Sequence, residues 1–540
     1  MDGRGRWLPD AVVMRCWQKV SPTTAWTFLV TVILGLAVHM YAFTNDLINH
    51  DDIYHLLQCE YGAQSGRWFL PLVLSWDGSF SMPWLIGLLS VLCLALTACL
   101  TVSLLRIRGR LSGLVTAALL VAFPTVAATF SYMFTADAYF FGLFLAAFAA
   151  YAAARMPVMG LPLGAGALIL SLGIYQSYFP VAAVLMVGAL LFDTLDGALS
   201  LKRLLLRGVK MVATLALAIF AYMAVARFVM RNAGGLTDYM GISEMGHLSL
   251  AELPALLIKC YSSYSGYFWN NGLGYFFGFV KPLIVVALLC AVALLLMLIV
   301  QTGMSVSRAV LALVLALLYP LAGDIIHVMV SGGAVHELML YGTIYLLVLP
   351  LGLVSYAAER QADGGGREHL STSLLSWVIV LSLALTAYSY AVADNKAYLK
   401  MEVSRDELTA YSNRLLSAVE QTPGYTPGMS LTLVGSSVVE PALTAQVPEL
   451  GEINMVGVLD AGQLRAKYSY GEFLRYYMAY PGDVYMANSS DNDPEAKAQA
   501  RATADLPEVQ AMPNYPADGS IRIINGGVVV KLNPEPAPTE

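Results

Sequence analysis

The sequence predicts an α-helical polytopic membrane protein with about eleven transmembrane helices, followed by a small extracytoplasmic α/β domain. Of the 540 residues, 58% are hydrophobic and only 13% are charged, whereas globular proteins average about 25% charged residues. Between residues 26 and 393, apolar stretches of about 20 residues, enough to cross a hydrocarbon core, follow one another. Charge returns beyond Lys396. We therefore expect a transmembrane domain over residues 1–395 and a soluble domain over residues 396–540.

The spans follow from the apolar stretches and their polar boundaries. The least regular region is 161–195, which is too long for one span even with strong tilt. A polar Tyr175-Gln176-Ser177-Tyr178 segment, followed soon by Pro180, predicts a tight hairpin there and therefore two spans. The predicted spans are residues 25–43, 83–105, 111–130, 137–154, 161–176, 179–195, 209–229, 281–301, 308–328, 338–357 and 372–392.

Positive charge predicts the orientation, because Lys and Arg are enriched in cytoplasmic loops. One set of alternate loops, which includes the N-terminal segment, residues 106–110 and residues 202–210, carries most of the Lys and Arg of this region. The N-terminus is therefore predicted to be cytoplasmic. An odd number of spans then places the C-terminal domain outside.

Charge and cysteine content narrow the function classes. The net charge is −6, and no basic patch with interleaved aromatic residues predicts a nucleic-acid partner. Six cysteines are scattered through the chain, with no CxxC pair and none in the C-terminal domain. Neither a disulfide framework nor a zinc site is indicated.

Two extracytoplasmic segments, residues 44–82 and 231–279, are too long to be simple connections. Both contain amphipathic stretches with aromatic residues, which favour helices lying in the plane of the membrane interface. Long loops with structure of their own commonly carry function.

The first of these segments contains His50, Asp51 and Asp52 directly after the first span. Adjacent carboxylates point in different directions, so the two aspartates are expected to have different roles. One would be a general base whose pKa is adjusted by neighbours and burial. The other would hold a hydroxyl group, a cation or a basic side chain. The alternative is a solvated loop in which Asn or Asp caps a helix at Ile53.

Other polar residues are predicted on the same side of the membrane. Arg67, next to Trp68, would bind a lipid phosphate, or the pair would be an interfacial anchor. Asp137 opens the fourth span, where an acidic residue is a functional candidate, with helix capping as the alternative. Tyr175 and Gln176 offer stacking and hydrogen bonds to a sugar, with packing as the alternative.

Four titratable residues lie near the ninth span and the loop after it: Asp324, His327, His336 and Glu337. Two histidines and two carboxylates are ligands that a divalent cation such as Mg²⁺ or Mn²⁺ would accept, although their spacing matches no known ligand motif. They are otherwise expected to contact the substrate.

All these polar residues fall on one predicted side, which favours a site at the outer interface of the lipid bilayer acting on a lipid-linked substrate. A flippase or transporter for lipid-linked glycans would place charges through its spans, often with internal repeats. A non-catalytic scaffold for envelope assembly would not need clustered carboxylates on the outer face. Both alternatives are weaker.

The stretches Asn49–Asp52 and Ser65–Trp68, the Tyr175-Gln176 turn and residues 512–521 resemble the bacterial serotype-converting type II glucosyl transferases, of the GT-C superfamily. The resemblance implies an inverting enzyme of the bacterial cytoplasmic membrane. It would transfer a hexose, glucose in this class, from a polyprenyl phosphate such as undecaprenyl phosphate to a cell-surface glycan such as O-antigen.

The resemblance also implies roles for single residues. Asp51 and Asp52 would be catalytic, and Asp137 would be a second acidic residue near the acceptor or a metal. His50 interrupts the Asn-Asp-Asp pattern of the family, which leaves open which aspartate is the base. The donor phosphate would rest on Arg67 or Lys281, since the later outer loop offers only His336.

The C-terminal domain shows strand patterns at 431–435, 521–524 and 528–532, the last two joined by Asn525-Gly526-Gly527 as a hairpin. Residues 484–506 are polar and rich in alanine and are predicted to be a flexible loop. No nucleophile motif or phosphate-binding loop is visible in this domain. Its expected role is acceptor positioning or capping of the site.

Overall fold

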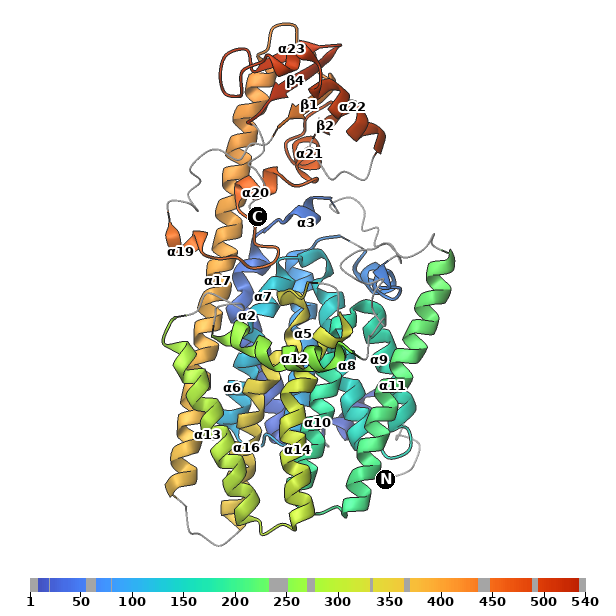
Figure 1. Ribbon diagram of the computed structural model, residues 1–540, viewed down its shortest axis with the longest axis vertical. Coiled ribbons are helices and arrows are strands. Elements are labelled where there is room, and N and C mark those ends of the chain that lie inside the picture. The colour runs from blue at the N-terminus through green and yellow to red at the C-terminus, as the bar shows by residue number, and fades with distance from the viewer. Residues whose placement is uncertain are drawn as a thin grey trace.

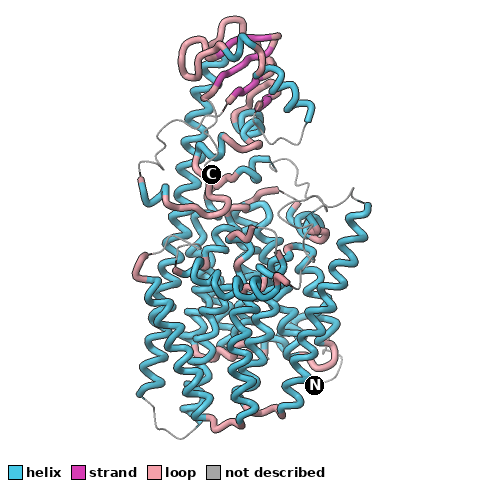
Figure 2. The backbone as a smooth tube through the Cα atoms, viewed as in Figure 1, coloured by secondary structure: helices cyan, strands magenta, loops and turns pink. Residues whose placement is uncertain are grey.

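A computed structural model shows a helical bundle with a small α/β unit at one end (Figure 1). The tube view shows that strands occur only in that unit among the described residues (Figure 2). The structure describes residues 8–18, 20–54, 65–78, 80–232, 251–269, 277–330, 334–363, 370–435, 447–487 and 494–533.

In the described part of the chain, nine helices are long and apolar enough to cross a membrane, which confirms a polytopic membrane protein. Each corresponds to a predicted span. They are α2 (Pro22–Thr44), α5 (Pro83–Leu104), α8 (Ala136–Arg155), α10 (Phe179–Asp196), α11 (Leu201–Asn232), α13 (Val280–Gln301), α14 (Val306–Gly323), α16 (Tyr345–Asp363) and α17 (Leu370–Glu420).

The predicted span 111–130 is a broken helix rather than a straight one. It consists of α6 (Arg110–Ala122) and α7 (Pro124–Phe130), which differ in direction by 44°. Pro124 causes the break, because it has no N–H to donate to the carbonyl of Leu120. The hydroxyl of Tyr341 donates to that carbonyl instead, over 2.8 Å.

The predicted hairpin within 161–195 is confirmed. Helix α9 (Gly160–Ile174) has 15 residues and ends before the single turn η5 (Gln176–Tyr178), after which α10 returns. The Ser171 hydroxyl donates to the backbone oxygen of Gly142 in α8 over 2.7 Å. The short α9 is thus fixed against its longer neighbour.

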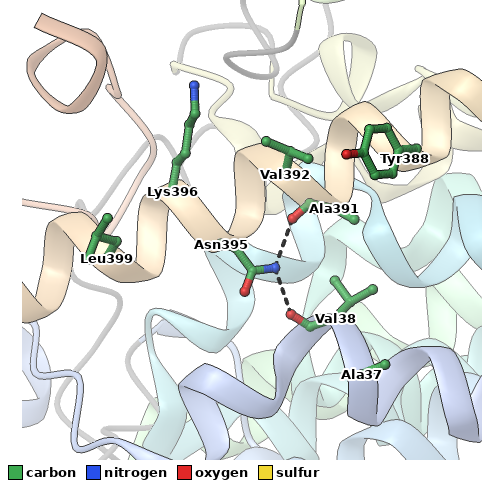
Figure 3. A pocket seen from close by; sticks show the side chains of 8 residues that line it. All are labelled: Ala37, Val38, Tyr388, Ala391, Val392, Asn395, Lys396 and Leu399. Carbon is green, nitrogen blue, oxygen red and sulfur yellow. Dashed lines mark hydrogen bonds between the residues drawn. The ribbon is translucent and has the colours of Figure 1, made fainter.

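Helix α17 is one continuous element of 51 residues that leads from the bundle into the α/β unit (Figure 1). The predicted boundary at residue 395 therefore falls inside a helix. The Asn395 amide donates to the backbone oxygens of Val38 in α2 (3.0 Å) and Ala391 (2.9 Å). The bond to Val38 fixes α17 to α2 at a mainly apolar groove of about 490 Å³, which Lys396 borders (Figure 3).

The α/β unit contains a four-stranded sheet in the order β2-β1-β4-β3, with bounds β1 (Leu431–Val434), β2 (Val484–Met486), β3 (Ile521–Ile524) and β4 (Gly527–Lys531). β1 is parallel to β2 and β4, while β3 and β4 form the predicted antiparallel hairpin. Asn525 and Gly526 both have positive φ, as a two-residue type I′ turn requires.

The flexible loop predicted over 484–506 is wrong. This segment contains β2 and α22 (Pro494–Ala504), and the alanines of α22 favour a helix. The prediction failed because a short edge strand and an alanine-rich surface helix carry too few apolar residues to show a period.

Helix α12 (Leu253–Phe268) lies across the bundle instead of along it (Figure 1). Its buried side chains, Leu256, Cys260, Tyr264 and Phe268, share one face, which confirms the amphipathic pattern for the described part of the second long segment. Residues 233–250 and 270–276 of that segment, and residues 55–64 of the first, lie outside the described residues.

The shorter elements complete the chain. In the bundle they are α1 (Pro9–Trp17), α3 (His50–Tyr54), α4 (Leu70–Leu74), η3 (Ser75–Asp77), η4 (Met133–Thr135), α15 (Ile326–Met329), η7 (Glu337–Met339) and η8 (Tyr341–Ile344). In the α/β unit they are α19 (Pro448–Gly451), α20 (Ala461–Arg465), α21 (Tyr470–Glu472), η9 (Phe473–Tyr477) and α23 (Pro507–Gln510).

A network of ion pairs lies at the end of the bundle that is far from the α/β unit. Asp193 near the end of α10 is 2% exposed and pairs with Arg106 (3.1 Å), Arg155 (2.8 Å) and Arg207. Arg106 also pairs with Asp196 over 3.1 Å. The network joins four segments of the bundle at the end that the positive charges predict to be cytoplasmic.

Candidate functional site

The first two aspartates of the candidate site lie on α3, which begins where the chain leaves α2. Asn49 caps this helix: its Oδ1 accepts the backbone N–H groups of Asp51 (2.7 Å) and Asp52 (3.0 Å). Its Nδ2 donates to the backbone oxygen of Ser131, at the end of α7. The expected capping is therefore present, and it fixes the two carboxylates relative to the bundle.

Asp51 lies at the rim of the site, with 27% of its side chain exposed. The hydroxyl of Tyr468, from the α/β unit, donates to its Oδ1. The Nε2 atom of His50 is 3.4 Å from the same oxygen. The His50 ring packs edge-on against the rings of Tyr132 and Tyr468. Asp51 is thus held between the bundle and the α/β unit while part of it stays accessible.

Asp52, the next residue after Asp51, is buried, with an exposed fraction of 5%. Neither of its carboxylate oxygens has a hydrogen-bond partner of normal geometry. Burial, followed by the negative charges of Asp46 and Asp51, raises the pKa of Asp52 well above its usual value. The nearby backbone N–H groups of Phe134 and Asn49 lower it by less. The two aspartates therefore have different environments.

Arg67 lies over two stacked tyrosine rings. Its Nη1 donates to the Tyr139 hydroxyl over 2.9 Å, and its guanidinium carbon is 5.1 Å from the centre of the Tyr175 ring. The Tyr139 and Tyr175 rings are parallel, 4.9 Å apart. Burial, together with the positive charge of Arg67, lowers the pKa of His336 to about 4, so His336 is a neutral neighbour of the guanidinium.

Gln176 shapes the segment that carries Arg67. Its Nε2 donates to the backbone oxygen of Ser65 (3.1 Å) and to the Tyr222 hydroxyl (2.7 Å), which in turn donates to the backbone oxygen of Gly66 (3.1 Å). Gly66 has a φ of 73°, a conformation that favours glycine. Trp68 packs against Gly173 of α9, where a Cβ would come within 2.8 Å of the indole.

Asp52 and Arg67 both contact one short stretch of chain, from Phe134 to Tyr139. Asp52 faces the backbone of Phe134, and Arg67 contacts Tyr139, five residues later. Five helical residues span about 8 Å, so the two clusters border a single region. Asp137 lies between them in the first turn of α8, buried, with its Oδ1 accepting the backbone N–H of Ala138.

Asp324 and His327 form a separate buried group beneath α12. Asp324 follows the end of α14 rather than lying inside a span, and the Ser263 hydroxyl of α12 donates to it. The Nε2 atom of His327 is 2.8 Å from the Tyr267 hydroxyl and 3.7 Å from Asp324 Oδ2. Burial raises the pKa of Asp324 to about 7 and lowers that of His327 to about 4.

Glu337 faces the α/β unit. Its backbone oxygen accepts the Thr125 hydroxyl over 3.0 Å, and its carboxylate faces the backbone N–H of Val456. Burial raises the pKa of Glu337. No three His, Cys, Asp or Glu side chains of the described residues come together as a metal-binding group. For Lys281, at the start of α13, no described contact joins it to the other candidates.

Sequence reasoning missed Tyr468 and Ser131. Tyr468 is 417 residues from Asp51 along the chain, so no local pattern connects the two. Ser131 directly follows the predicted span 111–130, and only the fold places its carbonyl at Asn49.

Comparison with known proteins identifies the family. The model of the glucosyl transferase GtrII family matches residues 40–347, more than half of the chain. The matched region contains the predicted site residues from His50 to Glu337, and it ends before the α/β unit. No curated protein and no solved structure matches the chain. This protein, a multi-pass membrane glycosyltransferase, belongs to the glucosyl transferase GtrII family.

Proposed function

We propose that this enzyme transfers glucose from a polyprenyl phosphate donor to a cell-surface glycan at the outer face of the bacterial cytoplasmic membrane, with inversion at the anomeric carbon. The observation that carries the proposal is the position of Asp51. It is a partly exposed carboxylate on α3, which lies between the bundle and the α/β unit (Figure 1). Arg67 contacts Tyr139 of α8, close to the backbone of Phe134 that Asp52 faces. This is where a lipid-linked sugar and a water-soluble glycan meet.

Asp51 is assigned as the general base. The acceptor hydroxyl attacks the anomeric carbon, the bond from that carbon to the phosphate oxygen breaks with its electron pair, and Asp51 takes the proton. Asp52 is too deeply buried for an acceptor to reach. Its raised pKa favours the protonated form, which limits charge repulsion between the two neighbouring carboxyl groups.

The leaving phosphate is assigned to Arg67. A guanidinium offers several N–H donors in a plane, which suits phosphate oxygens as negative charge develops on them. His336, which stays neutral above about pH 4, would add a hydrogen bond rather than a charge. The Tyr139 and Tyr175 rings hold the guanidinium in place.

The remaining candidates receive supporting roles. Asp137, between the two clusters, would contact the sugar or the acceptor. Asp324 and His327 lie toward α12 and would line the donor side. Glu337 would contact the substrate where the bundle meets the α/β unit, while Lys281 and Trp68 would contact lipid headgroups. Among the described residues, no three His, Cys, Asp or Glu side chains are grouped to hold a divalent cation. The transfer reaction is therefore written with side chains alone.

The test uses the purified full-length protein with polyprenyl-phosphate glucose and an acceptor glycan. The measurements are release of free polyprenyl phosphate and the anomeric configuration of the product. We expect transfer with inversion, and we expect Asp51→Asn to lower kcat by about 10²–10⁴-fold, the usual contribution of a general base. Asp406→Asn, an exposed carboxylate on α17, is the matched control.

Two results would overturn the proposal. The first is the absence of acceptor-dependent release of polyprenyl phosphate by the wild-type enzyme. The second is full activity of Asp51→Asn with an unchanged melting temperature.

A further inference from the structure

Tyr468 of the α/β unit contacts the catalytic Asp51 directly. Asp51 lies inside the region that the family model matches, whereas Tyr468 lies outside it. The segment from Ile453 to Val458, here called the strap, runs between α19 and α20 and lies on the outer end of the bundle. Tyr468 follows ten residues after the strap. Helix α20 lies between the strap and this tyrosine.

The strap is fixed to the bundle along its length. The buried Lys400 of α17 donates to the backbone oxygen of Ile453 over 2.6 Å. The Ser131 hydroxyl donates to the backbone oxygen of Val456 over 3.0 Å, and Glu337 faces the backbone N–H of the same residue. Val456 is therefore held from both sides by residues of the membrane part.

Gly457 allows this close approach. A Cβ at this position would lie 1.9 Å from the Ser131 hydroxyl oxygen, and the φ of Gly457 is 83°. Both the missing side chain and the left-handed backbone are required there. The backbone carbonyl of Ser131 also accepts the side-chain N–H of Asn49. The turn that follows α7 therefore fixes both α3 and the strap.

From these contacts we infer that Tyr468 is a positioning residue for the transfer reaction, holding one oxygen of Asp51 so that the other faces the acceptor hydroxyl. The inference rests on the proposed function of Asp51. It assigns a role to the α/β unit, which completes the catalytic centre instead of only covering it. A carboxylate that accepts a hydroxyl donor on one oxygen keeps its ionised form favoured and its orientation fixed.

In the described part of the chain, few charged groups lie around Asp51. His50 and Asp52 belong to its own helix, and Lys467 precedes Tyr468 on the α/β unit. Tyr468→Phe leaves all three in place and removes only the phenol donor. A carboxylate without a hydroxyl donor binds a proton more readily, so the acid limb of the pH profile of kcat/KM moves to higher pH.

The experiment measures kcat and kcat/KM of full-length Tyr468→Phe from about pH 4 to pH 9 with polyprenyl-phosphate glucose and the acceptor glycan. We expect the acid limb to move up by about one pH unit, a tenfold loss at pH values below it, and little change on the alkaline side. Tyr476→Phe, an exposed tyrosine of the same unit, is the matched control. A merely structural defect would lower activity equally at every pH.

A second variant tests the same contact through the backbone. Gly457→Ala displaces the strap from Ser131, and we expect it to shift the acid limb in the same direction. In the Tyr468→Phe background, it should add no further shift, because the hydrogen bond it breaks is already gone.

The inference fails if wild-type transfer is present and Asp51→Asn is inactive, but Tyr468→Phe has the wild-type pH profile. It also fails if Tyr468→Phe is faster at every pH, since the hydroxyl would then block Asp51 rather than position it. Failure of the proposed function is different: the wild type would show no transfer, or Asp51→Asn would remain active.

Discussion

Asp193 and Asp52 are both buried carboxylates, at opposite ends of the bundle, and their surroundings are opposite in charge. Asp193 is surrounded by Arg106, Arg155 and Arg207. Asp52 has the carboxylates of Asp46 and Asp51 as its charged neighbours, and neither of its oxygens has a hydrogen-bond partner of normal geometry. The first arrangement stabilises the fold. The second costs stability and is therefore expected where the chemistry needs it.

The two ends also differ in what they join. The Asp193 network connects helices and loops of the bundle, and the arginine partners of Asp193 lie at most 87 positions from it along the chain. At the Asp52 end, the contacts join the bundle to residues of the α/β unit that are hundreds of positions away. A burial pattern alone does not separate a structural carboxylate from a functional one. The charges around it do.

The largest effect on stability is expected from Asp193→Ala. Removal of one partner of a buried ion pair leaves uncompensated charge and costs about 3–5 kcal/mol, so the melting temperature in detergent should fall sharply. Asp196→Ala is the matched control, because its half-buried pair with Arg106 is worth about 0–1 kcal/mol. Equal melting temperatures for the two variants would show that the buried Asp193 stabilises the fold no more than the half-buried Asp196 does.

A smaller effect, on donor use, is expected from Arg67→Lys. Lysine keeps the charge but loses the planar set of donors and the stacking on Tyr175. We expect the KM for the polyprenyl-phosphate donor to rise about 10–100-fold, the equivalent of roughly 1.4–2.7 kcal/mol. The KM for the acceptor should change little. Arg227→Lys, exposed on α11, is the control, and an unchanged donor KM in Arg67→Lys would show that the phosphate binds elsewhere.

The smallest effect is a gain in stability for Asp52→Asn. The pKa of Asp52 is raised in the folded state, so its contribution to stability is present below the unfolded pKa of about 3.8 and is lost as pH rises through the folded pKa. At pH 7–8 the amide removes the free-energy cost of burying a carboxylate, and the melting temperature should rise by roughly 1 °C for each kcal/mol gained, because the unfolding entropy grows with chain length. Near pH 3.5 the difference should vanish. A lower melting temperature at neutral pH would show that the Asp52 carboxylate stabilises the fold.

Local chemistry made much of this protein predictable. Apolar length gave the spans, the polar turn at Tyr175-Gln176 gave the hairpin between α9 and α10, and Asn525-Gly526 gave the β3–β4 turn. The sequence made Asp51, Asp52 and Arg67 candidates, because placing a charged residue next to a membrane costs free energy and such residues often have a function. All of these depend on neighbours within a few residues.

Only the tertiary structure decided how these parts meet. Hydropathy could not show that β2 and α22 occupy a polar stretch. It also could not distinguish Asp51 from Asp52, which differ by one position in sequence but face the rim and the interior. The physical reason is that burial, charge environment and the Tyr468 contact depend on packing between distant segments, which no local period records.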